Sequence, residues 1–383
     1  MKVAQVTLRF DAPGGVETNV REIARRLAAA GVDVTVFASD LWDESGWQRR
    51  SGYPPVVDGV PVRRFPVRKR LVPGLTMPMM VGLIDALSES GADVLHAHSH
   101  RYGHVLQAAA VSSRRRIPLV VSTHYHPADR REPTIKRGLL RLQDVLFGST
   151  AYRVARALVV ETELEARRLR EFAPADRLRV IPPGIDLAEW AHPELDRPPP
   201  GLPDRYVVFH GRLASNKGLE TLVAAVGEIP PGDRLPVVFV GPDWGMQPRL
   251  EAAARRAGVE GLLRFVGWQP PAATRGIVRG ASALVLPSEW EAFGLVLLMG
   301  MAARTPLVAT AVGGVPEVLE GGRAGRLVPY GDPAALARAL VEVGRDGAAT
   351  RAMVARAAER VQGYDWSVAA DRHRALYREL AGG

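Results

Sequence analysis

The chain has 383 residues, of which 47% are hydrophobic and 24% charged, a composition typical of a globular protein and not of a disordered one. This length favours two domains, because single hydrophobic cores stop growing near about 250–300 residues. The absence of cysteine excludes disulfides, thiolate metal sites and a cysteine nucleophile. The net charge of +9 indicates an anionic partner such as a nucleotide or lipid headgroup, or else only an arginine-rich composition.

No segment has the apolar core and cleavage site of a signal peptide, and no run of about 18 apolar residues could span a bilayer. We therefore expect a cytoplasmic protein, either free or bound peripherally to the inner face of the membrane.

In the first half of the chain, short apolar runs alternate with amphipathic segments, which predicts a parallel, doubly wound α/β sheet. The runs are apolar along their whole length, as expected for strands that are covered on both faces. Helices are expected over residues 16–30, 77–90 and 105–115. Strands are expected over residues 3–8, 34–38, 60–65, 94–96, 119–123, 158–160 and 179–181.

A proline-rich stretch between residues 182 and 201 interrupts this alternation and predicts a linker or hinge. The alternation then resumes with strands expected over 206–210, 237–240, 263–266, 283–286, 307–309 and 326–328, and helices over 218–227, 248–257, 293–303, 333–343 and 349–360. The predicted organisation is a first Rossmann-like domain (1–190), a linker (191–202), a second Rossmann-like domain (203–360) and a terminal segment (361–383) with a helix over 366–380.

Ligands of doubly wound sheets bind outside the carboxyl ends of the strands, so the loops that follow strands are the places to search. Gly14 and Gly15 lie between the first strand and the first helix. Glycines there let a ligand approach the backbone, and a helix N-terminus presents free N–H groups to it. The alternative is a flexible turn. The absence of a GxGxxG motif argues against a nicotinamide-dependent dehydrogenase.

The loop after the first strand of the second domain carries Arg212 and Lys217 and leads into a helix. Two cations next to a positive helix end are suited to a diphosphate, although an ordinary solvated basic loop has the same composition.

Two further loops of the second domain complete the pattern. Glu291 precedes a helix and could accept hydrogen bonds from sugar hydroxyls or cap that helix. Gly313 and Gly314 precede another helix start and form either an anion cradle or a tight loop. Together with Arg212 and Lys217, they fall at strand ends of one sheet and predict a single binding crevice.

Several histidines gather in the first domain, but a metal site is not expected, because Asp93 is the only nearby carboxylate and the chain has no D-x-D triad. We interpret these histidines as lining the crevice or contacting sugars, with His98 or His100 near the acceptor. The histidines of this group are His96, His98, His100, His104, His124 and His126.

Residues 63–70 and 130–141 are basic with interleaved apolar residues. They predict a peripheral contact with an anionic membrane or an anionic acceptor site, unless they form an ordinary basic face. No nucleic-acid-binding motif is present, so no nucleic-acid partner is expected.

The motifs GGVE, STHYH, GRLASNKG, PSEWEAFG and TAVGGVPEV, in this order, resemble those of retaining glycosyltransferases of family 4 over essentially the whole chain. The resemblance implies the GT-B fold, in which two Rossmann-like domains face a central cleft and the last helix crosses back to the first domain. It also implies transfer of a hexose-type sugar from a nucleotide-diphosphate sugar to an unknown hydroxyl acceptor, without metal or cofactor. In retaining members a front-side route is favoured, in which the leaving phosphate helps to deprotonate the acceptor.

The resemblance also implies roles for individual residues. His124 would hydrogen-bond the donor sugar near the reacting carbon, Arg212 and Lys217 would hold the diphosphate, and Glu291 would bind sugar hydroxyls. The other donor-binding positions that it implies are Gly14 and Gly15 at the sugar and diphosphate, Gly211, Trp268 in the stretch that lines the base, the backbone N–H groups of Phe293, Gly294 and Leu295, and Gly313 and Gly314.

The chain departs from the family at one position. A second glutamate, which accepts hydrogen bonds from the ribose hydroxyls, should follow Glu291 by eight positions, and this chain has Met299 there. Methionine is only a weak acceptor. The alternative to an enzyme is therefore a non-catalytic homologue that binds sugar nucleotides, or a partner subunit.

Overall fold

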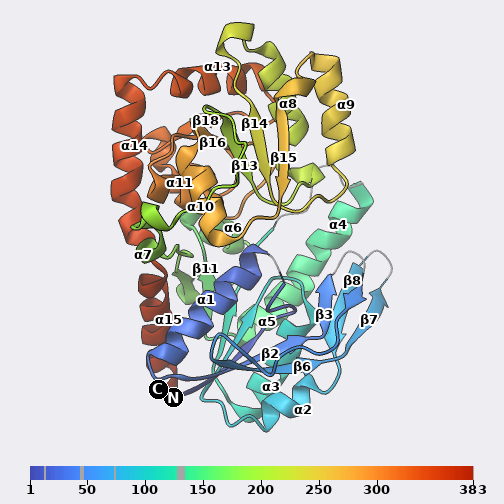
Figure 1. Cartoon of the computed structure of the whole chain (residues 1–383). Helices are drawn as coiled ribbons and strands as arrows, with labels where there is room; N and C mark the ends of the chain where they lie inside the picture. The colour runs from blue at the N-terminus through green and yellow to red at the C-terminus, as the bar shows by residue number, and fades with distance from the viewer. Residues whose placement is uncertain (13, 44–46, 73–74, 127–133, 383) are drawn as a thin grey trace. The chain divides into compact units, whose positions relative to one another are not determined.

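The computed structural model describes residues 1–12, 14–43, 47–72, 75–126 and 134–382 (Figure 1). The chain forms two compact units, one of residues 1–183 with 366–383 and the other of residues 184–365. The predicted boundary near residue 190 therefore lies seven or so residues too late. Residues 184–190 belong to the second unit because Ile185 forms a parallel bridge with Asp365, whose carboxylate accepts a 3.1 Å hydrogen bond from the backbone N–H of Leu187.

The first unit contains an eight-stranded sheet of order β12-β11-β10-β9-β1-β2-β6-β5. All of its ladders are parallel except the short β5–β6 pair at the edge, which confirms the predicted doubly wound sheet. Its strands are β1 (Lys2–Val6), β2 (Asp33–Ser39), β5 (Val56–Val57), β6 (Val60–Phe65), β9 (Val94–His98), β10 (Leu119–Ser122), β11 (Ala157–Val160) and β12 (Leu178–Val180).

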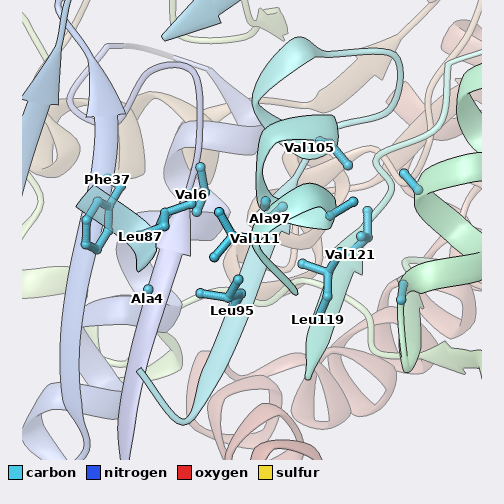
Figure 2. Close-up of a cluster of buried hydrophobic side chains, with 14 of the residues drawn as sticks. Ala4, Val6, Phe37, Leu87, Leu95, Ala97, Val105, Val111, Leu119 and Val121 are labelled. Atoms are coloured by element: carbon cyan, nitrogen blue, oxygen red, sulfur yellow. The ribbon is translucent and has the colours of Figure 1, made fainter. Parts of the chain in front are cut away.

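Helices cover both faces of this sheet. On one face, Leu95 of β9 and Val121 of β10 pack with Val111, from the helix that follows β9, in the core shown in Figure 2. On the other face, His96 of β9 meets Tyr377 of the terminal helix, which packs beside the first helix. The helices are α1 (Gly15–Ala29), α2 (Leu83–Ser88), α3 (Gly103–Arg115), α4 (Thr134–Gln143), α5 (Ser149–Val154), α6 (Glu163–Leu169) and α15 (Trp366–Ala381), with a π-helical turn at Asp144–Gly148.

The prediction of a helix over residues 77–90 is wrong for the first half of this range. Residues Leu75–Met80 form strand β8, which pairs with β7 (Val67–Val72) as a hairpin, and α2 begins only after Gly82. Pro78 cannot donate a backbone hydrogen bond inside a helix, and Gly82 adopts a left-handed conformation with φ of 81°. A second short hairpin joins β3 (Leu41–Asp43) and β4 (Gln48–Arg49).

The second unit is a six-stranded, wholly parallel sheet of order β15-β14-β13-β16-β17-β18. Alternate residues of one strand enter different cores: Val237 and Phe239 face one side, and Val238 and Val240 face the other. The strands are β13 (Val207–His210), β14 (Val237–Val240), β15 (Leu263–Gly267), β16 (Ala283–Leu286), β17 (Leu307–Thr310) and β18 (Arg326–Val328); the α-helices are α7 (Leu187–Trp190), α8 (Leu219–Glu228), α9 (Gln247–Ala257), α10 (Pro271–Gly280), α11 (Leu295–Ala303), α12 (Val315–Val318), α13 (Pro333–Gly344) and α14 (Ala348–Arg360).

The proline-rich stretch, where a linker or hinge is expected over residues 191–202, is packed on the second unit. The buried carboxylate of Asp196 accepts hydrogen bonds from Arg275 and Arg279 of α10 at 3.2 and 2.8 Å. The backbone N–H of Arg197 donates to the carbonyl of Ala272 at 3.1 Å. These contacts explain why the stretch belongs to the second unit. In the part of the chain that the structure describes, no helix is long and apolar enough to cross a membrane.

Candidate active site

Three loops of the second unit pack backbone against backbone at the carboxyl edge of its sheet. They follow β13, β16 and β17, whose parallel pairing brings their ends to the same edge. A Cβ atom at Gly218 would lie 1.9 Å from the carbonyl oxygen of Pro287, and one at Gly313 would lie 1.8 Å from that of Glu291. Both glycines also have positive φ, of 64° and 52°. The glycines are therefore needed for the loops to meet.

The structure brings Lys217 and Glu291 into direct contact. The ammonium of Lys217 lies 2.7 Å from Oε1 of Glu291, and the hydroxyl of Ser288 donates to the same oxygen at 2.7 Å. No side-chain hydrogen bond caps α11, so Glu291 does not play the capping role that the sequence left open. The backbone N–H of Gly314 donates to the carbonyl of Glu291 at 3.0 Å, which ties the Gly313–Gly314 loop to the same place.

Two exposed aromatic side chains lie on loops of the same unit. The guanidinium of Arg212 lies 4.3 Å from the ring centre of Trp244, in cation–π geometry. Trp244 follows β14 and is 47% exposed, and Trp268 follows β15 and is 66% exposed. Trp268 is among the positions that the family resemblance implies, whereas Trp244 is not, because its only signal in the sequence is an aromatic residue shortly after the end of a strand.

Helix α11 begins next to Glu291. Its N-cap is Gly294, with φ of 89°, and the side chain of Phe293 is buried against Tyr364, so only the backbone of Phe293 could face a ligand. Leu295 and Met299 lie one turn apart on the half-buried face of α11. Met299 therefore shares a helix face with the first turn and is not sealed in the core.

In the first unit, Gly14 is the N-cap of α1 and Gly15 its first residue. A Cβ atom at Gly14 would lie 2.0 Å from Oε2 of Glu17, whose other oxygen pairs with Arg9 at 2.5 Å. A side chain at position 14 would therefore displace the carboxylate end of Glu17 from its present position.

His124 follows β10 with a φ of 43°, a left-handed conformation that is uncommon outside glycine. Its Nδ1 atom lies 2.8 Å from Oε1 of Glu161, and its Nε2 atom lies 3.5 Å from Nδ1 of His98. Burial alone would lower the pKa of His124. The hydrogen bond and charge of Glu161, helped by the charges of Glu165 and Glu17, outweigh burial and raise this pKa above its usual value.

Three other histidines of the cluster, His96, His100 and His104, form hydrogen bonds within the first unit. His96 bonds Tyr377 at 2.5 Å and Ser122 at 2.8 Å, and His104 bonds the carbonyl of His98 at 2.6 Å. Both ring nitrogens of His100 are engaged, by Tyr152 at 2.6 Å and Asp144 at 2.7 Å, so His100 offers no nitrogen to an acceptor as it stands. Among the described residues, no three His, Asp or Glu side chains are placed to hold a metal ion together.

Two Rossmann-like units in one chain, with candidate ligand-binding loops at the carboxyl ends of parallel strands, define a glycosyltransferase fold of the GT-B class. The structure of sucrose-phosphate synthase from Thermosynechococcus elongatus has the same fold, with a TM-score of 0.77 over 100% of this chain and 99% of that one at 24% identity. Residues 13–189 match the model of glycosyltransferase family 4, and residues 204–346 match that of group 1 glycosyl transferases.

The chain belongs to the family 4, group 1 glycosyltransferases. It is 32% identical to D-inositol 3-phosphate glycosyltransferase 1 of Catenulispora acidiphila, over 97% of this chain and 92% of the relative. It is 30% identical to the phosphatidyl-myo-inositol mannosyltransferase of Mycolicibacterium smegmatis, again over 97% and 92% of the two chains. The expected family and fold class are thereby confirmed.

Proposed function

We propose that this enzyme is a retaining, metal-independent glycosyltransferase that moves a hexose-type sugar from a nucleotide-diphosphate sugar to a hydroxyl group. The observation that carries the proposal is the Lys217–Glu291 pair at the carboxyl edge of the second sheet, with Arg212 on the same loop. Two cations next to helix starts can neutralise a departing diphosphate, and preorganised charge of this kind commonly gives the largest catalytic term.

The pair also couples diphosphate binding to sugar binding. An incoming phosphate competes with Glu291 for the ammonium of Lys217, because a carboxylate and a phosphate both accept from it. When Lys217 turns to phosphate, Glu291 keeps the hydroxyl of Ser288 and has acceptor capacity for sugar hydroxyls. Lys217 and Glu291 thus exchange one mutual contact for two contacts with the donor.

The reaction then needs no protein nucleophile. The acceptor oxygen attacks the anomeric carbon on the face from which the diphosphate leaves, so the new bond keeps the configuration of the old one. The carbon–oxygen bond to phosphate breaks, its electron pair stays with the phosphate, and the acceptor proton passes to a phosphate oxygen. His124 accepts or donates one hydrogen bond to the donor sugar near that carbon.

The acceptor class that we propose is an inositol phosphate, free or lipid-linked, because the two relatives above are named for such acceptors. The test is release of nucleoside diphosphate from a panel of nucleotide sugars, with inositol 3-phosphate, phosphatidylinositol vesicles or no acceptor. We expect acceptor-dependent release that persists in excess EDTA. Complete loss on chelation, restored by Mg²⁺ or Mn²⁺, would exclude the metal-independent route.

Met299 favours one alternative, a homologue that binds sugar nucleotides without transferring the sugar. In that case calorimetry would detect nucleotide binding, while none of the donors would turn over with any acceptor of the panel.

We also propose a peripheral contact with anionic membranes through helix α4. Ile135, Leu139, Leu142 and Leu146 recur at helical spacing and lie exposed, Ile135 by 81%; we call them the apolar stripe. Helix α4 contains three basic residues and no acidic one. An apolar face with flanking cations is suited to the headgroup region of an anionic bilayer.

The position of α4 links this surface to the sheet edge. Asp144, the first residue of the π-helical turn after α4, is buried and bonds His100 and Arg101 in the loop after β9. A lipid surface on the apolar stripe would therefore lie near the edge where acceptors are expected. In the first basic segment, Arg63 stacks on Phe37 and Arg64 pairs with Asp11 at 2.6 Å, so these two residues have partners within the first unit. Residues 130–133 of the second segment lie outside the described residues.

Co-sedimentation with vesicles of phosphatidylcholine, with and without phosphatidylglycerol, tests this contact. We expect binding only to the anionic vesicles, weakened by salt, and at least about tenfold weaker binding for Ile135→Ser/Leu142→Ser. The matched control is Val56→Ser/Leu195→Ser, because both of those residues are equally exposed, at 51%, outside the stripe. Equal binding of the two double variants would contradict the proposal.

A further inference from the structure

Glu161 lies beside His124 because two neighbouring strands end together. β10 and β11 pair in parallel up to Ser122 and Val159, so the residues that follow them leave the sheet at the same edge. Glu161 is the first residue after β11, and its carboxylate meets Nδ1 of His124 at 2.8 Å. Both side chains are largely buried, with 13% of Glu161 and 7% of His124 exposed.

A second carboxylate fixes the backbone around this pair. Glu165, in the first turn of α6, accepts hydrogen bonds from the Thr123 hydroxyl at 2.5 Å and from the Tyr125 N–H at 2.8 Å, on either side of His124. Its other oxygen accepts from the N–H of Glu161 at 2.7 Å. One buried side chain thus joins both loops and holds His124 in its left-handed conformation, which costs free energy for a residue other than glycine.

The chemistry of the pair determines which way His124 can act. An ionised carboxylate only accepts hydrogen bonds, so Nδ1 of His124 must carry a proton. The hydrogen-bonding atom left for another partner is Nε2. Its neighbour in the structure, Nδ1 of His98, is 3.5 Å away, which is long for a hydrogen bond, so Nε2 is only weakly engaged.

We infer that Glu161 is a positioning residue, which holds the proton on Nδ1 of His124 and presents Nε2 of that ring to the donor sugar. The inference rests on the assignment of His124 to the donor sugar in the proposed function and adds a residue that the sequence motifs do not include. Glu161 escapes notice in the sequence because a glutamate between a strand and a helix is typical of helix capping. Here Thr162, not Glu161, caps α6.

Several ionisable groups surround His124, and they decide how its protonation responds to the loss of Glu161. The carboxylates favour the charged ring, and the neighbouring imidazoles oppose a further positive charge. These groups are Glu161 after β11, Glu165 on α6, Glu17 on α1, His96 and His98 on β9 and His373 on α15.

Glu161→Gln and Glu161→Leu separate charge from hydrogen bonding. Glutamine keeps an acceptor oxygen but no charge, so we expect the Nδ1–H tautomer to remain while the pKa of His124 falls. Leucine removes both effects, so we expect the tautomer to be lost. Nitrogen-detected NMR of labelled histidine measures both quantities without any substrate. The control is Glu163→Gln, because Glu163 is exposed on the same helix.

Kinetics supply the second arm. We expect Glu161→Leu to lower kcat about 10- to 100-fold with a smaller change in the KM for the donor, and Glu161→Gln to lie between it and the wild type. Wild-type kcat in Glu161→Leu, or an Nε2–H tautomer in the wild-type protein, would overturn the inference. If no donor turned over at all, the proposed function would fail, and the NMR arm would still decide the role of Glu161.

Discussion

At the scale of single residues, Lys217 and Glu291 determine what the second unit can bind. Each neutralises the other at 2.7 Å, so neither is an unpaired charge at the sheet edge. Both are partly exposed, at 18% and 15% of their side chains, which makes the pair a modest contributor to stability but accessible to an anion. Their contact therefore predicts variants that lose activity more than stability.

Lys217→Ala and Arg212→Ala should each lower kcat about 10- to 100-fold, because each removes a charge-assisted contact to the leaving diphosphate. The melting temperature should change little. Arg249→Ala, which breaks an exposed ion pair with Glu220 elsewhere in the unit, is the matched control. Steady-state kinetics and thermal melts on the same preparations measure both effects, and wild-type turnover in both variants would remove the diphosphate assignment.

Met299→Glu should tighten nucleotide binding by about five- to 150-fold, equivalent to roughly 1–3 kcal/mol. Met299 is half-buried on the face of α11 that it shares with Leu295, so a carboxylate there can reach water or ribose hydroxyls. Met299→Gln separates the effect of charge from that of size. Calorimetry with nucleoside diphosphates gives the affinity. Weaker binding with a lower melting temperature would mean that position 299 packs as core and that the ribose is held otherwise.

The sequence predicted some of these residues and missed others for identifiable reasons. Arg212, Lys217 and Glu291 fall after strands of one parallel sheet, so spacing alone brings them to one edge. Glu161, Glu165 and Trp244 were missed because their partners, His124, Thr123 and Arg212, lie on other loops. A contact between side chains of two different loops cannot be predicted from the local sequence pattern of either loop.

At the scale of elements, the second unit depends on loops that interlock through glycine. Gly218 and Gly313 combine positive φ with carbonyl oxygens where their Cβ atoms would stand, so no other residue fits without moving a loop. The two loops, which carry Lys217 and Gly314, each pack against the loop that carries Glu291, and the contact of the Gly218 loop with it sets the distance from Lys217 to Glu291.

Gly313→Ala should therefore lower the free energy of unfolding by about 1–3 kcal/mol and weaken nucleotide binding as well. The matched control is Gly232→Ala, since a Cβ atom there meets nothing within 4 Å and Gly232 does not have positive φ. Urea denaturation measures the difference. Equal stability of the two variants would show that the loops can separate at little cost.

Strand prediction succeeded for the parallel strands of the two main sheets and failed for the hairpin strands outside them. β10 and β14 were located within one residue because both of their faces are buried. β7, with the sequence VRKRLV, looked like a basic surface segment, and its partner β8 was read as part of a helix. Hairpins outside the main sheet lack the continuous apolar run on which the prediction depends.

At the scale of the whole molecule, buried histidines make stability depend on pH. Burial lowers the pKa of His104 and of His373 to about 4, against a usual value of 6.5. Glu165 acts in the opposite direction, since burial and the charge of Glu161 raise its pKa to about 7.

The melting temperature should fall as the pH is lowered from 7 to 5. Below pH 6.5 the histidines bind protons in the unfolded chain but remain neutral in the folded protein. The free energy of unfolding therefore falls by up to roughly 2–3 kcal/mol for each such histidine by pH 4. The raised pKa of Glu165 stabilises the folded protein fully at pH values below the pKa that this group has in the unfolded chain. This contribution is lost as the pH rises through the pKa of the folded state. Lowering the pH from 7 to 5 therefore restores it and offsets part of the fall in melting temperature. Thermal melts across this range measure the sum. A melting temperature that rose toward pH 5 would contradict the dominance of the histidines.

The central claim, retaining transfer from a nucleotide sugar, is tested most directly by proton NMR of the glycoside formed during turnover. Starting from an α-configured donor and the best acceptor of the panel, the account predicts that the first product detected carries an α linkage. Spectra recorded early in the reaction exclude later anomerisation. A β-linked first product would show inversion, which would require a general base on the far side of the sugar and would contradict the front-side mechanism built on Arg212 and Lys217.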